Sequence, residues 1–184
     1  MLELDGLKLF IPVERLCIGS WVGSVGSRQK INFDAAFNKQ LKESCSGFVI
    51  RNDKAQIIGS KIVMNSNIPS AFAAEAVACL HALQLGLHLG LKEVEIEGDS
   101  WTTCVFLFTN RDANKVAHLI TSEGIRRRES TYLANQVFSG AVETVAEDRR
   151  RTESMRDLRS RRRGEEDGNV SLNLFVEDFS RRRE

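Results

Sequence analysis

The sequence predicts an α/β fold in which a mixed sheet starts with three antiparallel strands and continues with a helix and a parallel strand. Three observations support this fold. Apolar and polar residues alternate along residues 30–37, as in a strand with one buried face. Two further β-rich runs flank the turn-forming residues 51–56, which is typical of an antiparallel hairpin. A long apolar helical run and then a β-type run at 93–98 follow, in the order of a parallel crossover.

Composition sets the broad class of the protein. The chain has 184 residues, of which 42% are hydrophobic, enough for one domain with a core and a tail. Its net charge of +1 provides no overall field for nucleic acid or membrane, so such binding would depend on local patches. Its four scattered cysteines lack the paired spacing of a zinc site and indicate reduced, intracellular thiols. No secretory signal and no run of about 18 apolar residues is evident, so we expect an intracellular protein without a membrane span.

The first strand carries a carboxylate in its middle. Its apolar positions are Ile31, Phe33, Ala35 and Phe37, and Asp34 lies between them. A buried carboxylate costs free energy unless a cation or a hydrogen-bond donor meets it. Asp34 is therefore a candidate functional residue.

The helix contributes a second carboxylate. Pro69 and Ser70 predict its start, with Ser70 as N-cap, and the apolar run continues to about Leu89. Helical spacing places Glu75 on a stripe whose other members are small and uncharged: Ala71, Cys79, Ala82 and Gly86. Glu75 either reaches solvent near the helix N-terminus, where the dipole favours a negative charge, or belongs to a functional group of side chains.

A third carboxylate, Asp99, directly follows the 93–98 run. Ligands of open α/β sheets collect at the carboxyl ends of strands. If the first and fourth strands are parallel neighbours, Asp34, Glu75 and Asp99 converge on one point. Carboxylate oxygens suit Mg²⁺, and two such ions roughly 4 Å apart can stabilise both the attacking and the leaving oxygen in phosphodiester cleavage.

Four segments in this order, "KINFDAAF", "GFVIRNDKAQIIG", "AEAVACLHALQLGLHLGLKEVEIEGDS" and "ANKVAHLI", resemble the ribonuclease H-like domains that are widespread in plants and related to the ribonuclease H of reverse transcriptases. The resemblance covers residues 21–121. It implies a five-stranded mixed sheet with helices on its faces. It also implies a hydrolase, an endonuclease, in which Asp34, Glu75 and Asp99 are catalytic and bind two Mg²⁺ ions, or Mn²⁺ in their place, to cut the RNA strand of an RNA/DNA hybrid.

Two residues depart from the family pattern. Ala35 replaces the glycine of the family's "DGA" and adds a methyl group beside the expected metal site. In "NKVAH", His118 occupies the position where many relatives carry a fourth aspartate. Histidine brings no negative charge and suits Mg²⁺ poorly. His118 is either an ordinary polar residue beside the closing helix or a direct metal ligand at the fourth position of the site.

The largest departure is a short connection. Only 19 residues separate Asp99 from His118, and residues 100–104 alone link the fourth strand to a candidate strand at Val105–Phe108. A parallel crossover needs a dozen or more residues. Val105–Phe108 therefore either turns back antiparallel or leaves the sheet edge. The joint indicates an internal deletion or an exon-skipped gene model, and loss of the covering helix predicts lower stability and exposed apolar surface.

These patterns predict three parts: an extension at 1–20, a ribonuclease H-like domain at 21–122 that is truncated between 99 and 118, and a tail at 123–184. From Ala141 onward the chain carries 11 basic and 11 acidic residues, which predicts a solvated helix or disorder. Arg126, Arg127 and Arg128 either contact nucleic-acid phosphates or form a solvated helix end. The basic triplets farther along the tail would also suit phosphate contact or nuclear import, but acidic neighbours offset their charge: 149–151, 161–163 and 181–183. A weaker third alternative is that the tail acts through a partner protein: the amphipathic segment "SLNLFV" at 171–176 would suit a sheet edge or a groove, but it is too short to be specific.

Two functions remain open. One is an RNA/DNA hybrid ribonuclease, weakened by the lost segment and by His118. The other is a non-catalytic module that binds nucleic acid or protein and keeps the fold without turnover. Metal-dependent cleavage separates them, and the pattern predicts no oligomeric state.

Overall fold

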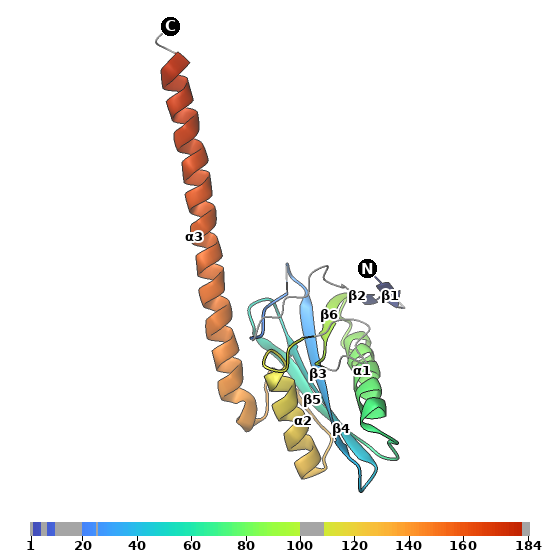
Figure 1. Ribbon diagram of the computed structural model, residues 1–184. Coiled ribbons are helices and arrows are strands. Elements are labelled where there is room, and N and C mark those ends of the chain that lie inside the picture. Colours follow the sequence, from blue (N-terminus) through green and yellow to red (C-terminus); the bar gives the residue numbers. More distant parts are fainter. Residues whose placement is uncertain (1, 5–6, 10–19, 25, 100–108, 182–184) are drawn as a thin grey trace. The chain divides into compact units, whose positions relative to one another are not determined.

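The computed structural model describes residues 2–4, 7–9, 20–24, 26–99 and 109–181 (Figure 1). It divides the chain into two compact units, residues 1–149 and 150–184. The described elements, in chain order, are β1 (Leu2–Leu4), β2 (Leu7–Leu9), β3 (Gln29–Asn38), β4 (Glu43–Arg51), β5 (Ile57–Asn65), α1 (Ala71–His88), β6 (Glu93–Glu97), α2 (Lys115–Arg127), β7 (Thr131–Ala134), the 3₁₀ turn η1 (Ser139–Ala141) and α3 (Val142–Arg181).

The sheet has the predicted mixed order. β3, β4 and β5 are consecutive antiparallel neighbours, and β6 lies parallel to β3 on its other side. The resemblance implied five strands, whereas the described residues form seven, in the order β1-β2-β6-β3-β4-β5-β7. The additional strands lie at the two edges: β2 pairs with β6, and β7 pairs with β5. The fold is nevertheless the mixed α/β arrangement that the sequence predicts.

Local chemistry sets the boundaries of these elements. Between β4 and β5, the side-chain oxygen of Asn52 accepts hydrogen bonds from the amides of Lys54 and Gln56, which closes the predicted turn. The hydroxyl of Ser70 accepts a hydrogen bond from the amide of Ala73, as the N-cap prediction requires. These two side chains fix the register of the hairpin and the first residue of α1.

The two helices of the domain pack on opposite faces of the sheet (Figure 1). Alternate residues of β3 point to opposite faces, so Ile31 and Phe33 pack under α1 while Asn32 and Asp34 face the α2 side. The core below α1 includes Ile31, Phe33, Phe48, Ile50, Ala78, Ala82, Leu85, Val94 and Ile96. The core below α2 includes Cys45, Val49, Ile62, Val116, Ala117 and Ile120.

Glycines allow α2 to lie very close to the sheet. A Cβ added to Gly47 of β4 would overlap the hydroxyl of Thr121 and lie 2.8 Å from its backbone nitrogen. A Cβ added to Gly124 of α2 would overlap the sulfur of Cys45 and lie 2.6 Å from a methyl carbon of Ile62. No larger residue fits at either position without displacing α2, and α2 carries two residues of the site described below.

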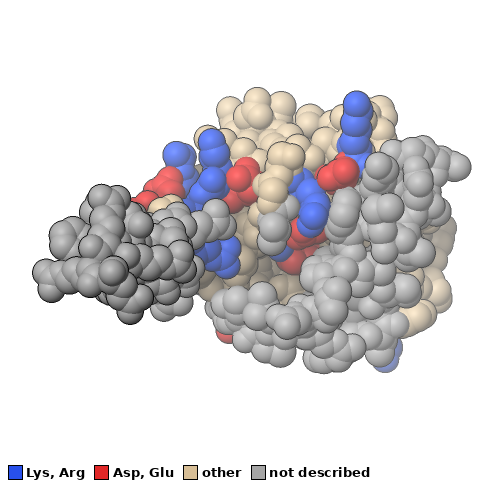
Figure 2. Space-filling view, turned by 90° about the horizontal axis from the view of Figure 1, so that it is seen from above, with Lys and Arg blue, Asp and Glu red and all other residues tan. Residues whose placement is uncertain are grey.

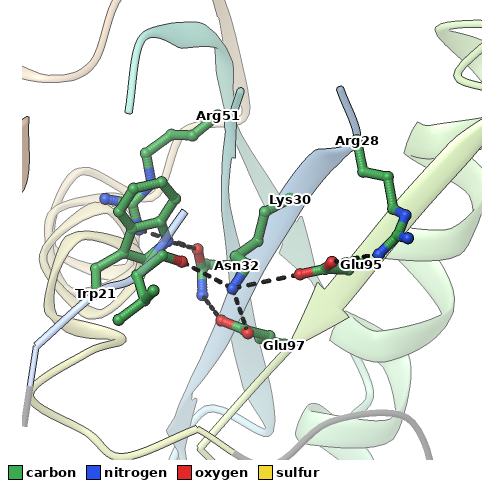
Figure 3. A network of polar contacts seen from close by, with 8 residues as sticks. Trp21, Arg28, Lys30, Asn32, Arg51, Glu95 and Glu97 are labelled. Atoms are coloured by element: carbon green, nitrogen blue, oxygen red, sulfur yellow. Dashed lines mark hydrogen bonds and ion pairs between the residues drawn. The ribbon is translucent and has the colours of Figure 1, made fainter. Parts of the chain in front are cut away.

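On the α2 side, part of the interior is a polar network instead of an apolar core (Figure 3). Asn32 is its centre: its side-chain oxygen accepts hydrogen bonds from Trp21 Nε1 at 2.8 Å and from Arg51 Nη2 at 2.9 Å. Its amide nitrogen donates to Glu97 Oε2 at 3.0 Å, and Lys30 Nζ donates to the other oxygen of Glu97 at 2.6 Å. The network therefore joins β3 to β4 and β6 through side chains as well as through the backbone.

Arg51 is the most deeply buried charge of this network. Its side chain is fully buried, its guanidinium lies 3.9 Å above the ring of Trp21, and its Nη1 donates to Asp148 Oδ2 at 2.6 Å. Burial lowers the pKa of Arg51 to about 10, although Asp148 opposes this effect. The buried guanidinium is stable only because the carboxylate of Asp148, the side-chain amide of Asn32 and the ring of Trp21 all contact it.

The compact unit extends past residue 122, where the sequence placed the end of the domain. β7 adds to the sheet, and Asp148 at the start of α3 pairs with Arg51. Of the two alternatives for the charged tail, the backbone adopts the helix, since α3 runs from Val142 to Arg181 and includes residues 171–176.

The candidate strand Val105–Phe108 lies outside the described residues. The backbone on either side of it is joined by a hydrogen bond from the amide of Thr109 to the carbonyl of Gly98.

Of the described helices, one is as long and as apolar as a membrane span. By length and composition alone, α1 would be able to cross a membrane. However, its small side chains Ala74, Ala78 and Ala82 are buried against the sheet, as in a helix that packs on a domain core. Its other face exposes Phe72, Leu80 and Leu87, with exposed fractions of 58%, 52% and 42%.

Candidate active site

Asp34 lies in the middle of β3 and is 95% buried, with its carboxylate directed to the α2 side. Its Oδ2 lies 2.9 Å from Nδ1 of His118 on α2. Its backbone carbonyl accepts a hydrogen bond from the hydroxyl of Thr121 at 3.3 Å. Thus α2 holds both the backbone and the side chain of Asp34.

Glu75 lies in the first half of α1 and is directed toward the same region. The backbone amide of Ala35 donates a hydrogen bond to it, and its Oε2 is buried without a hydrogen-bond partner among the described residues. Burial, followed by the negative charges of Asp34 and Asp99, raises the pKa of Glu75 to about 8. The alternative in which Glu75 simply reaches solvent is therefore wrong.

Asp99 follows β6, and parallel pairing of β6 with β3 brings it near Asp34. Burial and then the charge of Asp34 raise the pKa of Asp99, and a hydrogen bond from Asn114 and the charge of Arg111 oppose this. The charges of Asp34 and Asp99 thus both act on Glu75, and the charge of Asp34 also acts on Asp99. Desolvation and this repulsion make the ionised forms of Glu75 and Asp99 costly in the absence of a cation.

Asn114 is a site residue that the sequence analysis missed. It occupies the N-cap position of α2, but its side chain makes no capping hydrogen bond. It is fully buried, and its Nδ2 donates to the carbonyl of Phe33 at 2.7 Å and to Asp99 Oδ1 at 3.4 Å. It therefore orients Asp99 against β3. The signal was present in the sequence as an asparagine directly before a helix, but that position usually indicates only a cap.

His118 and Arg111 form a chain of contacts with Asp34. Arg111 Nη2 lies 3.3 Å from His118 Nε2. A guanidinium can only donate, so Nε2 is the acceptor, and His118 then carries its proton on Nδ1 and donates it to Asp34. The hydrogen bond to Asp34 raises the pKa of His118. The structure thus brings His118 to the site, and sequence reasoning missed its partner Arg111.

The donor set fits a hard divalent cation. Carboxylate oxygens are the ligands that Mg²⁺ prefers, and the partnerless Oε2 of Glu75 is an acceptor with no donor. Among the residues that the structure describes, however, no three His, Cys, Asp or Glu side chains have the spacing of a ready-made metal cluster. The carboxylates are neighbours that a cation would have to draw together.

Arg126, Arg127 and Arg128 lie at the other end of α2 from His118. Arg126 and Arg127 pair with Glu123, and Arg128 Nη2 lies 2.7 Å from Glu43 Oε1. On the face seen from above, which is not the end of α2 that carries the triplet, Lys and Arg side chains also lie next to Asp and Glu side chains (Figure 2). The arginine triplet is therefore not an unopposed basic patch, and its role in phosphate binding stays a prediction.

The mixed sheet, its helices and the carboxylate group contain the arrangement that the resemblance to ribonuclease H-like domains implies. Residues 32–103 match a family model described as reverse transcriptase-like, and this range contains Asp34, Glu75 and Asp99. A search of curated proteins found none that matches. Among 70 matching chains of solved structures is "Crystal structure of Aa-Ago with externally-bound siRNA", at 12% identity and a TM-score of 0.33. That match covers 61% of this chain and only 17% of the other.

Proposed function

We propose that this protein is a divalent-cation-dependent endonuclease that hydrolyses the RNA strand of an RNA/DNA hybrid. Asp34, Glu75 and Asp99 would hold the cation, with Mg²⁺ as the natural ion and Mn²⁺ able to replace it. A cation bound there would stabilise the negative charge that develops on the scissile phosphate. The short connection between Asp99 and His118 makes us expect slow turnover.

The observation that carries this proposal is the buried, negatively charged environment of the Glu75 carboxylate. Its carboxylate is largely buried, faces the charges of Asp34 and Asp99, and keeps one oxygen without a partner among the described residues. Such an arrangement is unfavourable for a purely structural carboxylate, and a divalent cation removes the cost. The match of residues 32–103 to the reverse transcriptase-like model supports the same chemistry.

The test is cleavage of an end-labelled RNA/DNA hybrid by the full chain in Mg²⁺ and in EDTA. We expect Mg²⁺-dependent products from the RNA strand, and loss of these products in the double variant Asp34→Asn/Asp99→Asn. Asp112→Asn is the matched control, because Asp112 is an exposed carboxylate close in sequence to Asn114 but outside the group. Cleavage that survives the double variant would contradict the proposal.

A second candidate, a non-catalytic binding module, is favoured by two observations. The described residues contain no ready-made metal cluster, and His118 already occupies one oxygen of Asp34. This candidate predicts that the chain binds the hybrid equally well in EDTA and in Ca²⁺ and never cuts it. Fluorescence anisotropy with a labelled hybrid, run beside the cleavage assay, separates the two functions.

A further inference from the structure

The contacts of His118 bear on how many cations the site can take. A histidine binds a metal through a nitrogen lone pair. In this structure Nδ1 is hydrogen-bonded to Asp34, and Nε2 accepts from Arg111. Neither nitrogen of His118 is therefore free to bind a cation while these two contacts persist.

Arg111 places a permanent positive charge beside His118. Its guanidinium contacts His118, and its charge opposes the rise in the pKa of Asp99 that burial and the charge of Asp34 cause. The residue is exposed, so a ligand can reach its other N–H groups. A guanidinium matches two phosphate oxygens with two parallel hydrogen bonds.

The charges of these side chains favour one cation over two. Asp34, Glu75 and Asp99 supply three negative charges when ionised. One divalent cation leaves a single negative charge, which Arg111 balances. Two divalent cations would leave a positive charge even before Arg111 is counted, and a partly buried site disfavours an uncompensated charge.

Building on the proposed function, we propose that the site binds one divalent cation, held by Asp34, Glu75 and Asp99, and that Arg111 binds the nucleic-acid phosphate in place of a second cation. His118 is a positioning residue: it links Arg111 to Asp34 and does not ligate the cation. This arrangement departs from the two ions that the family resemblance implies. It also explains how a site that lacks the fourth aspartate retains a balanced charge.

The number of cations is measured directly by titrating the full chain with Mn²⁺ and following free Mn²⁺ by electron paramagnetic resonance. We expect saturation at one Mn²⁺ per wild-type chain and at two for His118→Asp, which replaces the imidazole by a fourth carboxylate. Asp34→Asn/Asp99→Asn gives the background from sites elsewhere on the chain. The side chain of His118 is 38% exposed, so this substitution should not prevent folding.

Arg111 is tested by two readouts. Arg111→Ala should bind Mn²⁺ more tightly, because a positive charge is removed. It should bind the RNA/DNA hybrid about tenfold more weakly in Ca²⁺, the loss expected for one charge-assisted contact. Lys92→Ala, which removes an exposed cation before β6, should change neither value.

The outcomes distinguish this inference from the proposed function. Two Mn²⁺ ions of similar affinity on the wild-type chain, or hybrid binding unchanged in Arg111→Ala, would overturn the inference and leave the proposed nuclease intact. No Mn²⁺ bound above the Asp34→Asn/Asp99→Asn background would overturn both.

Discussion

Nδ1 of His118 on α2 lies 2.9 Å from Oδ2 of Asp34 in the middle of β3. The two residues are 84 positions apart in the chain, so no local structure brings them together. Their contact depends on how closely α2 approaches the sheet. The approach in turn depends on glycines and on small side chains at the interface. Packing at the interface between α2 and the sheet therefore sets the geometry at Asp34, whose partner on β4 is Gly47.

Substitution of Gly47 tests this dependence. Gly47→Ala would force its new methyl group against Thr121, which hydrogen-bonds to the Asp34 carbonyl. We expect a loss of about 1–3 kcal/mol in the free energy of unfolding, measured in urea, and reduced cleavage. Gly140→Ala is the control, since a Cβ there meets no atom within 4 Å. Equal effects of the two substitutions would contradict the proposed role of α2 packing.

The buried ion pair of Arg51 predicts a large stability effect. Asp148→Ala removes the carboxylate that lies 2.6 Å from a fully buried guanidinium. Loss of one partner of a buried pair costs about 3–5 kcal/mol, because the other charge stays uncompensated. Thermal unfolding should show this loss, and the double variant Arg51→Met/Asp148→Leu should recover much of it. A single variant as stable as wild type would show that the pair does not hold the structure.

The pKa of Glu75 predicts how stability depends on pH without a divalent cation. Its value is about 8 in the folded state and near 4.5 when unfolded. As the pH rises across this window, the unfolded chain loses the proton first, so the free energy of unfolding falls. Glu75→Gln, which stays neutral, removes this loss. We therefore expect the variant to match wild type near pH 5 and to be more stable near pH 8 in EDTA.

Urea unfolding of both proteins at these two pH values checks this expectation. Addition of Mg²⁺ at pH 8 should make the wild type more stable than Glu75→Gln, since only the wild type keeps the full set of carboxylates. Identical stabilities of the two proteins at both pH values would contradict the burial and charge coupling of Glu75.

The exposed face of α1 predicts an effect on solubility. The triple variant Phe72→Gln/Leu80→Gln/Leu87→Gln changes only side chains that are 42–58% exposed. Stability should stay within about 0.5 kcal/mol of wild type for each substitution, while the concentration at which the protein aggregates should rise. Light scattering against concentration measures this. A cooperative loss of structure in the triple variant would instead show that this face is packed.

Sequence patterns predicted the central elements because their chemistry is local. The alternation in β3, the Asn52 turn and the Ser70 cap are all short-range features, and each is present in the structure. The parallel pairing of β6 with β3 was also predicted, since a helix between two strands favours a parallel crossover. These elements were sufficient to predict that Asp34, Glu75 and Asp99 approach one another.

Other features depend on tertiary contacts that no local pattern reveals. β7 is a four-residue strand whose position is fixed only by pairing with β5, so its sequence looked like part of a tail. Sequence patterns did not single out Asn114 or Arg111, because their roles come from contacts with β3, Asp99 and His118. The partner of Arg51, Asp148, is 97 residues away in the chain.

The central claim is that one cation is shared by Asp34, Glu75 and Asp99. It is tested most directly by adding Mn²⁺ at less than one equivalent to isotope-labelled protein and recording which backbone amide signals broaden. The account predicts that the signals around residues 34–35, 75 and 99 are lost together, while those around Glu43 and Glu123 persist. Broadening that spares any one of the three carboxylates, or that is confined to other acidic residues, would contradict it.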